Sequence, residues 1–573
     1  MSTEKTKPII GFIVSLISVM IIFLGAIMLL VLGAPLAGIL GILFVSLIMI
    51  FARRGYLTTN MKAQHIYGAI LIVIGLVVIG LIVMIVIGIS LALGLMGIIA
   101  GFLSVIGGAL ISHGARSIMP SIPSQKTSPV RSIVSFAWRW LEIPLIGILG
   151  GVSAMTAFFL AAFLFDTATM LFVVAFVVGF LIASGGVWLS MRKMRPIKPR
   201  RVTLGALGVG VAAMLLLALV FSLTILAPWP STVAARQLPT VPAGVKYWNL
   251  STGSHIAYLE IPAQGAPKAT PFIFVGGGPG DEDAADATVT QFFGQVAQLG
   301  YNVYIYDQIG AGLSARLADP AQYTLARHVA DLEAIRAQIG AQQMILLGFS
   351  WGGTLVANYM AAYPQNVAKA IFMSPAPINW FEWPNFADDT YFLNDTAKQQ
   401  VNQMFSSLNI ELWLQLAIIN PKAALSLVSN QEADAFDNTV VLLSSPGCVY
   451  DPSHIPNQWA SLNGNGFYDS FFAGDIGASI HPKVNPRTIL SSDPTPTLIM
   501  TGSHNFVSWA PTWQYKTTLP NSTLLYFQDA GHYLFLDQPQ LCYASIQAFL
   551  IGTSLPIQPW TSSQPPSTYQ GPL

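Results

Sequence analysis

The strongest constraint on this chain is a row of charge-poor apolar stretches in its first 227 residues. Each has close to the roughly 20 residues that a helix needs to cross the hydrocarbon core of a bilayer. The sequence therefore predicts an all-α polytopic membrane domain over 1–227. The first stretch is expected to be retained, because its apolar run is far longer than that of a signal peptide. The seven predicted helices cover approximately 8–32, 35–52, 67–89, 91–112, 143–165, 167–190 and 203–227.

The positions of Lys and Arg predict the orientation of these helices. Residues 1–202 carry 15 Lys and Arg against 3 Asp and Glu. The cations lie before the first stretch and after the second, fourth and sixth, whereas the alternate connections carry none. Because Lys and Arg are retained on the cytoplasmic side, we expect a multi-pass plasma membrane protein with a cytoplasmic N-terminus. Everything after about residue 226 is then outside the cytoplasm.

The amino-acid composition supports this assignment and argues against some classes of function. Only 9% of the 573 residues are charged, against roughly 25% in a soluble globular protein. The formal net charge of +1 argues against a nucleic-acid-binding chain. No ionisable residue lies near the middle of any stretch, although transporters usually need polar groups at that depth. We therefore expect the helices to anchor the chain in the lipid bilayer.

The second half of the chain is built differently. Residues 203–573 carry 12 Lys and Arg against 23 Asp and Glu. A Pro-rich linker at 228–244 precedes a region, 245–552, in which strand-like runs alternate with helical segments. This pattern is typical of an α/β sheet with parallel strands. A cap is predicted at about 377–492 and a flexible tail at 553–573. The predicted strands are Lys246–Leu250, Ile256–Ile261, Phe272–Val275, Val303–Tyr306, Met344–Leu347, Ala370–Met373, Thr497–Met500 and Leu524–Phe527.

Three loops at predicted strand ends carry the residue types of acyl-transfer chemistry. One is a G-x-S-x-G motif at 348–352, in which a tight strand-to-helix turn would expose the hydroxyl of Ser350. A Gly-rich loop at 276–280 follows another strand. We expect backbone N–H groups of Trp351 and of Gly277 or Gly278 to form an oxyanion hole. His532 follows the last predicted strand, as the chain order Ser…acid…His requires.

With these motifs in this order, residues 245–550 resemble the proline iminopeptidase-like α/β-hydrolases. The resemblance implies an α/β-hydrolase fold with a lid, a nucleophile at Ser350 and a base at His532. It also implies short peptides with a free amino terminus as substrates, and no metal or other cofactor. It rests on 276–280 (His-Gly-Gly-Pro-Gly in the family), 307–314 (Asp-Gln-Arg-Gly-x-Gly-x-Ser), 331–336, 348–353 (Gly-x-Ser-Trp-Gly-Gly) and 531–532.

Three positions depart from the family pattern. Gly276 replaces its histidine, Ile309 replaces its arginine, and the loop that should end in the triad acid ends in Asn505. An asparagine can hold an imidazole by hydrogen bonding but cannot stabilise an imidazolium electrostatically. Three interpretations stay open. Glu382 or Asp529 supplies the acid instead, the site works as a Ser-His-Asn set, or hydrolysis is lost and the pocket only binds a ligand.

The sequence thus predicts a membrane-anchored extracytoplasmic serine hydrolase, foremost an aminopeptidase that forms an acyl-enzyme on Ser350. Two alternatives remain, an esterase or lipase acting on membrane-derived amphiphiles and a hydrolysis-deficient ligand-binding sensor. The expected partners are a small peptide or ester substrate and the lipid bilayer, with no nucleic acid. Cys448 and Cys542 could form a disulfide outside the cytoplasm or remain two buried thiols. The sequence does not reveal the oligomeric state.

Overall fold

The computed structural model describes residues 129–192, 199–231, 241–383, 385–457, 459, 466–477 and 484–573. The four predicted membrane helices at 8–32, 35–52, 67–89 and 91–112 lie outside the described residues. The chain forms two compact units. One joins the residues up to Ala227 to Glu411–Ala423, a segment of the predicted cap. The other contains Pro228–Ile410 and Ala424–Leu573.

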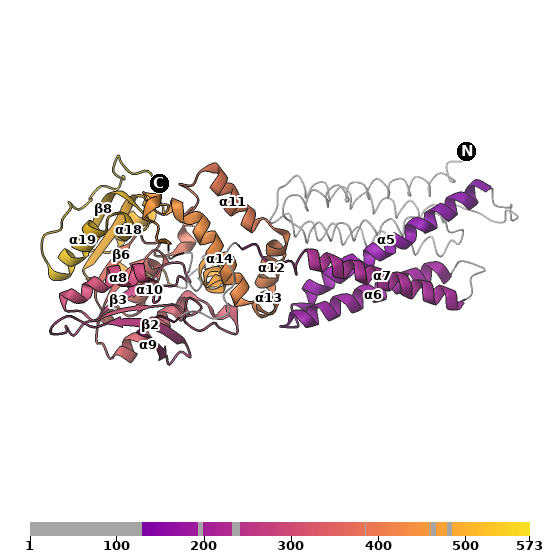
Figure 1. The fold of residues 1–573 in the computed structure, drawn as a ribbon, viewed down its shortest axis with the longest axis horizontal. Coiled ribbons are helices and arrows are strands. Elements are labelled where there is room, and N and C mark those ends of the chain that lie inside the picture. Colours follow the sequence, from indigo (N-terminus) through magenta and orange to yellow (C-terminus); the bar gives the residue numbers. More distant parts are fainter. Residues whose placement is uncertain are drawn as a thin grey trace. The chain divides into compact units, whose positions relative to one another are not determined.

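The described part of the first unit contains three long helices, α5 (Pro129–Ala161), α6 (Ala168–Arg192) and α7 (Pro199–Leu223), shown in Figure 1. Helices α6 and α7 are long and apolar enough to cross a membrane, with mean hydropathies of 2.5 and 2.6, and α5 holds a shorter apolar stretch, Ile146–Ala161. Three of the predicted membrane helices, 143–165, 167–190 and 203–227, lie among the described residues. Two of these three meet the criterion. The seven-helix domain as a whole stays a prediction.

Small residues bring α5 and α6 close together. A Cβ atom built on Gly150 would lie 2.7 Å from Ala183 Cβ, and one built on Gly179 would lie 2.7 Å from Ala154 Cβ. Larger apolar side chains such as Leu181 are exposed instead. Small residues between helices and leucines outside them are typical of helices that pack in lipid.

The cap segment of the first unit is tied to the turn between α5 and α6. Asn420 follows helix α12 (Leu408–Ile419). Its Nδ2 donates to Ala162 O at 2.9 Å, to Phe165 O at 3.2 Å and to Asp166 Oδ1 at 2.9 Å. Through these contacts, part of the cap belongs to the helical unit.

The second unit is built on one eight-stranded sheet with the order β1-β2-β4-β3-β5-β6-β7-β8. Strand β2 pairs antiparallel with β1 and β4, and all other neighbours are parallel. Each of the eight predicted strands overlaps one of the observed strands. These are β1 (Val245–Asn249), β2 (His255–Ile261), β3 (Phe272–Val275), β4 (Val303–Tyr306), β5 (Met344–Phe349), β6 (Val367–Met373), β7 (Thr497–His504) and β8 (Ser522–Gly531).

Helices cover both faces of this sheet. Phe274 and Leu347 belong to a core that includes residues of α8 (Ala287–Gly294), α18 (Leu534–Asp537) and α19 (Pro539–Ile551). Their chain neighbours Ile273 and Leu346 point to the opposite face and are also fully buried, as expected for parallel strands covered on both sides. The helices α9 (Leu325–Ile339), α10 (Trp351–Ala362) and α17 (Trp509–Thr518) supply that second layer.

The predicted cap corresponds to a helical region between β6 and β7. Its described helices are α11 (Asp395–Phe405), α12, α13 (Pro421–Leu427), α14 (Asn430–Ser444), α15 (Phe467–Asp469) and α16 (Pro486–Leu490). Cys448 follows α14 and Cys542 lies in α19, and both are buried free thiols. Of the two alternatives for these cysteines, the structure has the unpaired thiols.

The C-terminal segment 553–573, expected to be a flexible tail, makes specific backbone contacts. The N–H of Gln570 donates to Ser503 O at 2.8 Å, and Pro572 O accepts from the N–H of Trp509 at 3.0 Å. A Cβ atom built on Gly571 would lie 2.2 Å from Asn505 O. The segment therefore covers the backbone at the end of β7.

Candidate active site

Ser350 occupies the tight turn that joins β5 to α10. Its backbone has φ 51° and ψ −121°, a conformation that is costly for a residue with a side chain. Two glycines make the turn possible. A Cβ atom on Gly348 would lie 2.5 Å from Gly352 O, and one on Gly352 would lie 2.1 Å from Val275 O. The structure thus places Ser350 on the strand-to-helix turn that the sequence predicts.

Two backbone segments flank this serine. Trp351 is the first residue of α10, so its N–H has no acceptor within the helix and lies at the positive end of the helix dipole. On the other side, a Cβ atom built on Gly277 would lie 3.1 Å from Ser350 Cβ. Gly278 follows with φ 92°, which favours glycine. Of the predicted oxyanion-hole donors, Gly277 therefore lies against Ser350 in space, and Trp351 follows Ser350 in the chain.

His532 follows β8 and is paired with Asn505. Its Nδ1 lies 2.8 Å from Asn505 Oδ1, and both side chains are buried. The ring of Phe349, the residue before Ser350, packs against the His532 ring with centroids 5.0 Å apart. The carboxyl ends of β5, β7 and β8 thus bring the predicted serine, asparagine and histidine to one edge of the sheet.

The surroundings of Asn505 identify which of its amide atoms faces the histidine. The backbone N–H of Val507 donates to Asn505 Oδ1 at 3.1 Å, and Asn505 Nδ2 donates to Thr501 Oγ1 at 3.1 Å. A backbone N–H can only donate, so the atom shared by Val507 and His532 is the amide oxygen. The proton of the neutral imidazole is then on Nδ1, which leaves Nε2 free to accept a proton.

His532 is held as a neutral imidazole. Burial lowers its pKa to about 3, because the charged form loses its hydration in the interior. Among the described residues, no carboxylate is hydrogen-bonded to this ring, and Asn505 supplies only a dipole. The histidine is therefore a base at neutral pH, but an imidazolium formed there has no adjacent counter-charge.

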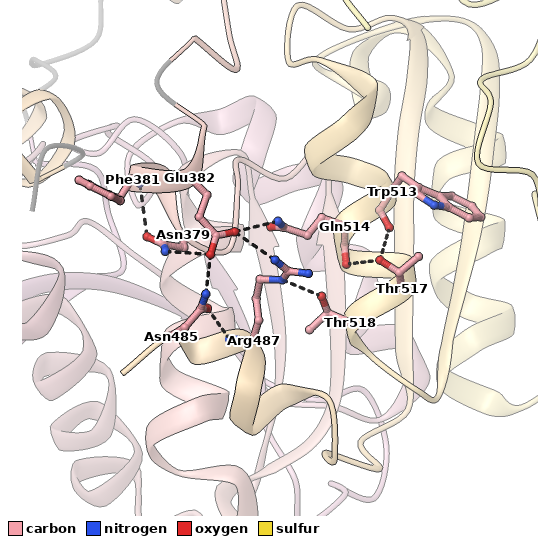
Figure 2. Close-up of polar contacts among 9 residues, drawn as sticks. All are labelled: Asn379, Phe381, Glu382, Asn485, Arg487, Trp513, Gln514, Thr517 and Thr518. Atoms are coloured by element: carbon pink, nitrogen blue, oxygen red, sulfur yellow. Dashed lines mark hydrogen bonds and ion pairs between the residues drawn. The ribbon is translucent and has the colours of Figure 1, made fainter. Parts of the chain in front are cut away.

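The structure does not bring Glu382 to His532. Figure 2 shows its carboxylate among polar side chains of other segments. It accepts hydrogen bonds from Asn379, Asn485, Arg487 and Gln514. These contacts, the ion pair to Arg487 included, lower its pKa although partial burial acts in the opposite direction. The Glu382 carboxylate thus connects the cap to α17 through these hydrogen bonds.

Asp529 is closer to the histidine in the chain but has other contacts. The negative charge of its carboxylate, together with a hydrogen bond to Tyr450, raises the pKa of that phenol. Its backbone oxygen accepts from Gln538 Nε2 at 3.3 Å. Asn505 is therefore the described side chain that orients His532.

The residues that follow β4 hold the Gly-rich loop in place. Asp307 Oδ1 accepts hydrogen bonds from the N–H groups of Asp283 and Ala284, both at 2.8 Å. Gln308 Nε2 donates to Gly276 O at 3.0 Å. Ile309, which stands where the resembled family has an arginine, is buried. Asp307 and Gln308 thus position the loop beside Ser350.

Sequence reasoning missed a group of carboxylates on the same loop. Asp281, Asp283 and Asp286 follow the glycines and line one small cavity, with Asp283 and Asp286 buried and Asp281 half-buried. Burial, together with neighbouring carboxylates, raises the pKa of Asp281 to about 6 and that of Asp283 well above its usual range. The signal in the sequence is the run Asp281-Glu282-Asp283 directly after Gly280.

Comparison with known proteins supports the fold. The alpha/beta hydrolase fold family matches residues 270–539. Proline iminopeptidases of Lactobacillus delbrueckii subsp. lactis and Heyndrickxia coagulans are each 34% identical over 22% of this chain, which is 42% and 41% of those proteins. The chain therefore matches less than half of the length of these relatives. A probable proline iminopeptidase of Leptolyngbya boryana is 25% identical over 48% of this chain and 85% of its own length.

The solved structures that this chain resembles include an esterase from Exiguobacterium antarcticum and the proline iminopeptidase of Mycobacterium smegmatis. The esterase is 17% identical with a TM-score of 0.38, and the match covers 53% of this chain and 99% of the esterase. The iminopeptidase is 19% identical with a TM-score of 0.35, over 54% of this chain and 98% of its own. From its sheet order, its serine turn and the family match, the C-terminal region has an α/β-hydrolase fold and is distantly similar to proline iminopeptidases.

Proposed function

We propose that this chain is a membrane-anchored extracytoplasmic serine hydrolase of the aminopeptidase type, acting on short peptides with a free amino terminus. The observation that carries the proposal is the meeting of Ser350, His532 and Asn505 at one sheet edge, with the imidazole proton on the side of Asn505. The sequence similarity to proline iminopeptidases supports the aminopeptidase class.

In the proposed reaction, Ser350 Oγ attacks the acyl carbon of the substrate while His532 Nε2 takes the hydroxyl proton. The N–H groups of Trp351 and the Gly277–Gly278 segment hold the oxyanion. The scissile C–N bond then breaks, and His532 gives the proton to the leaving amine. Water attacks the resulting ester with His532 again as base, and cleavage of the ester bond to Ser350 releases the acid.

Asn505 makes this reaction slower than a triad with a carboxylate would, because the transient imidazolium lacks a negative partner. In a serine protease the Asp-to-Asn change costs about 10⁴ in turnover, a loss attributed to the wrong tautomer. Here the amide oxygen faces Nδ1, so the productive tautomer is retained. The proposed enzyme therefore loses the electrostatic contribution and keeps the orienting one.

The proposal includes the seven-helix anchor and its orientation. The two apolar helices α6 and α7 support membrane insertion, and the cation distribution supports a cytoplasmic N-terminus. Proteolysis of intact cells is the test of orientation. An added protease should remove the region after about residue 230, and full protection of that region would contradict the proposed topology.

A second candidate, an esterase or lipase acting on amphiphiles from the bilayer, is favoured by one observation. Cap segment Glu411–Ala423 groups with the apolar helices and is bonded to the α5–α6 turn through Asn420. Phe163 and Leu164 on that turn and Ile418 on α12 are exposed, as expected for side chains that enter a membrane surface. Such a cap could receive an amphiphile directly from lipid.

The two candidates are separated by substrate. Purified protein in detergent is assayed with prolyl p-nitroanilide and with p-nitrophenyl esters of short and long acyl chains. The aminopeptidase proposal expects turnover of the prolyl substrate that is lost in Ser350→Ala and His532→Ala and retained in Ser453→Ala, a change at an exposed serine. Turnover of the long-chain ester alone would favour the lipase, and no turnover at all would favour a binding-only pocket.

A further inference from the structure

A short stretch of the C-terminal segment lies against the loop that carries Asn505. This loop, residues 505–508, joins β7 to α17. The stretch, residues 569–572, is here called the strap. Its polar contacts lie on both sides of Asn505 in the chain. The strap therefore bears on the geometry of the candidate catalytic site, although none of its residues belongs to the Ser-His-Asn set.

On the side that precedes Asn505, the strap binds the end of β7. The N–H of Gln570 donates to Ser503 O at 2.8 Å. Gln570 Oε1 lies 2.9 Å from His504 Nδ1. The strap thus contacts the last two residues of β7, which are the two residues directly before Asn505.

On the side that follows Asn505, the strap binds the loop and the first residue of α17. Tyr569 OH lies 3.2 Å from Val507 O and 3.0 Å from Pro572 O, and its one proton is shared between these two acceptors. The N–H of Trp509 donates to Pro572 O at 3.0 Å. The rings of Trp509 and Tyr569 also pack together, with centroids 5.4 Å apart. The loop is therefore attached to the strap at both of its ends.

Two contacts connect the strap to Asn505 itself. Val507, whose carbonyl accepts from the strap, donates its own N–H to Asn505 Oδ1 at 3.1 Å. This oxygen is the atom that faces His532 Nδ1. Gly571 is buried against the backbone, because a Cβ atom built on it would lie 2.2 Å from Asn505 O. The strap thus touches the backbone of Asn505 and the residue that holds its side chain.

The cap holds the same loop independently of the strap. The N–H of Ser508 donates to Phe386 O at 2.8 Å, and Ala387 forms an isolated antiparallel bridge with Val507. These contacts remain when the strap is altered. Losing the strap is therefore expected to displace Asn505 without detaching the loop from the protein.

Precise positioning matters more for an asparagine than for an aspartate. The attraction between two charges falls only with the inverse of their distance. A hydrogen bond between neutral groups needs a donor–acceptor distance of about 2.9 Å and weakens steeply when it is bent. Asn505 offers His532 a dipole without a charge. A small displacement of the loop would therefore cost this site more than it would cost a triad with a carboxylate.

We propose that the strap is a positioning element of the Ser-His-Asn set, which fixes the loop so that Asn505 Oδ1 stays within hydrogen-bonding distance of His532 Nδ1. The inference rests on the proposed function, because such positioning matters only if His532 activates Ser350. It gives a role in the reaction to a segment that lies beyond the family match, which ends at residue 539.

The test measures the rate at which a fluorophosphonate labels Ser350 in detergent-purified protein. Tyr569→Phe removes the hydroxyl of the strap, and deletion of 569–573 removes the strap. We expect labelling to slow about three- to tenfold in Tyr569→Phe, the factor that corresponds to one hydrogen bond between neutral groups, and further in the deletion variant. Ser567→Ala, at an exposed position before the strap, and Tyr247→Phe, at an exposed tyrosine in β1, should label at the original rate.

A double-mutant cycle shows whether the strap acts through Asn505. In the Asn505→Ala background, Tyr569→Phe and the deletion should not slow labelling further, because the side chain that the strap positions is gone. Hydrogen–deuterium exchange of the peptide that covers 503–509, measured by mass spectrometry, should rise with both changes in either background, since it reports on the loop itself.

Three results would overturn the proposal. They are an unchanged labelling rate in Tyr569→Phe, unchanged exchange of 503–509, and an equal loss of labelling with and without the Asn505 side chain. Tyr569→Phe decides the outcome if the deletion variant fails to fold, which its Tm shows. Failure of the proposed function is distinguishable, because the unmodified protein itself would then not react with the fluorophosphonate.

Discussion

Asn505 Oδ1 lies 2.8 Å from His532 Nδ1, at the position where an acid would complete a catalytic triad. The same oxygen accepts the backbone N–H of Val507, and the amide nitrogen is committed to Thr501. The asparagine therefore fixes the ring orientation and the tautomer of the histidine. It lacks the charge that would stabilise the protonated ring.

Replacing Asn505 with aspartate should raise activity. The carboxylate would accept the same hydrogen bonds from Val507 and His532, and Thr501 Oγ1 could donate where it now accepts. A negative partner raises the pKa of His532 from its burial-lowered value of about 3. We expect kcat/KM in Asn505→Asp to rise by about 10- to 1,000-fold, a fraction of the reported cost of losing the acid, and its acid limb to move to higher pH.

The measurement is a pH series of kcat/KM for the original protein and Asn505→Asp on the same substrate. Thermal unfolding of both proteins shows whether the variant is folded. A folded Asn505→Asp protein whose activity is unchanged or lower would show that the asparagine is not in the place of the acid.

Asp281→Asn should stabilise the protein at alkaline pH. The pKa of Asp281 in the folded protein is about 6 against an ordinary value of 3.8, so the folded state holds this proton more tightly than the unfolded state does. Its contribution to stability is therefore fully present below pH 4 and is lost as the pH rises through about 6. We expect the Tm of Asp281→Asn to exceed that of the original protein by a few degrees, about 2–4 °C per kcal/mol, at pH 8.

At pH 4 the two proteins should unfold at nearly the same temperature. Asp395→Asn serves as the control, because its side chain is exposed. A constant difference between pH 4 and pH 8 would contradict the account of Asp281 as a carboxyl group whose pKa is raised in the folded protein.

Gly276→Ala should disrupt the loop through Asp283. The added Cβ would lie 1.7 Å from Asp283 Oδ2, so the carboxylate must move or the loop must shift. We expect a lower Tm. The double variant Gly276→Ala/Asp283→Ala should recover part of the stability, because the clashing carboxylate is gone. Independent, additive effects in this double-mutant cycle would show that the two residues do not interact.

Asn420→Ala should weaken the helical unit. The change removes the hydrogen bonds that Asn420 Nδ2 donates to Ala162 O, Phe165 O and Asp166 Oδ1 and leaves two backbone oxygens without this partner. A loss of about 1–3 kcal/mol is expected, measured as a lower Tm in detergent. Asn457→Ala, at an exposed position, is the control. An unchanged Tm would mean that the cap segment does not stabilise the α5–α6 turn.

Much of the fold was predictable because buried parallel strands are short apolar runs between turn residues. The tight turn at Ser350 was predictable from its G-x-S-x-G motif. Only glycine fits at Gly348 and Gly352, because a side chain there would meet Gly352 O or Val275 O. The pairing of Asn505 with His532 followed from the order of motifs in the resembled family. These features depend on local pattern or on chain order.

Other features depend on contacts between distant segments. The acidic run after Gly280 is ordinary in the sequence, and only the approach of Asp283 to Gly276 shows that a carboxylate is buried there. Glu382 was one of several acids in the cap, and its bonds to Arg487 and Gln514 become visible only in three dimensions. The tail was predicted to be flexible from its Pro and Ser content, and its backbone bonds to Ser503 and Trp509 could not be anticipated from composition.

The most direct test of the account is covalent labelling of Ser350. Membranes containing the protein are treated with a fluorophosphonate probe, and the modified peptide is identified by mass spectrometry. The account predicts that the label is on Ser350, that labelling is lost in Ser350→Ala and strongly slowed in His532→Ala, and that it is faster in Asn505→Asp. Absence of any label in the folded, unmodified protein would contradict the claim that a Ser-His-Asn set can activate this serine.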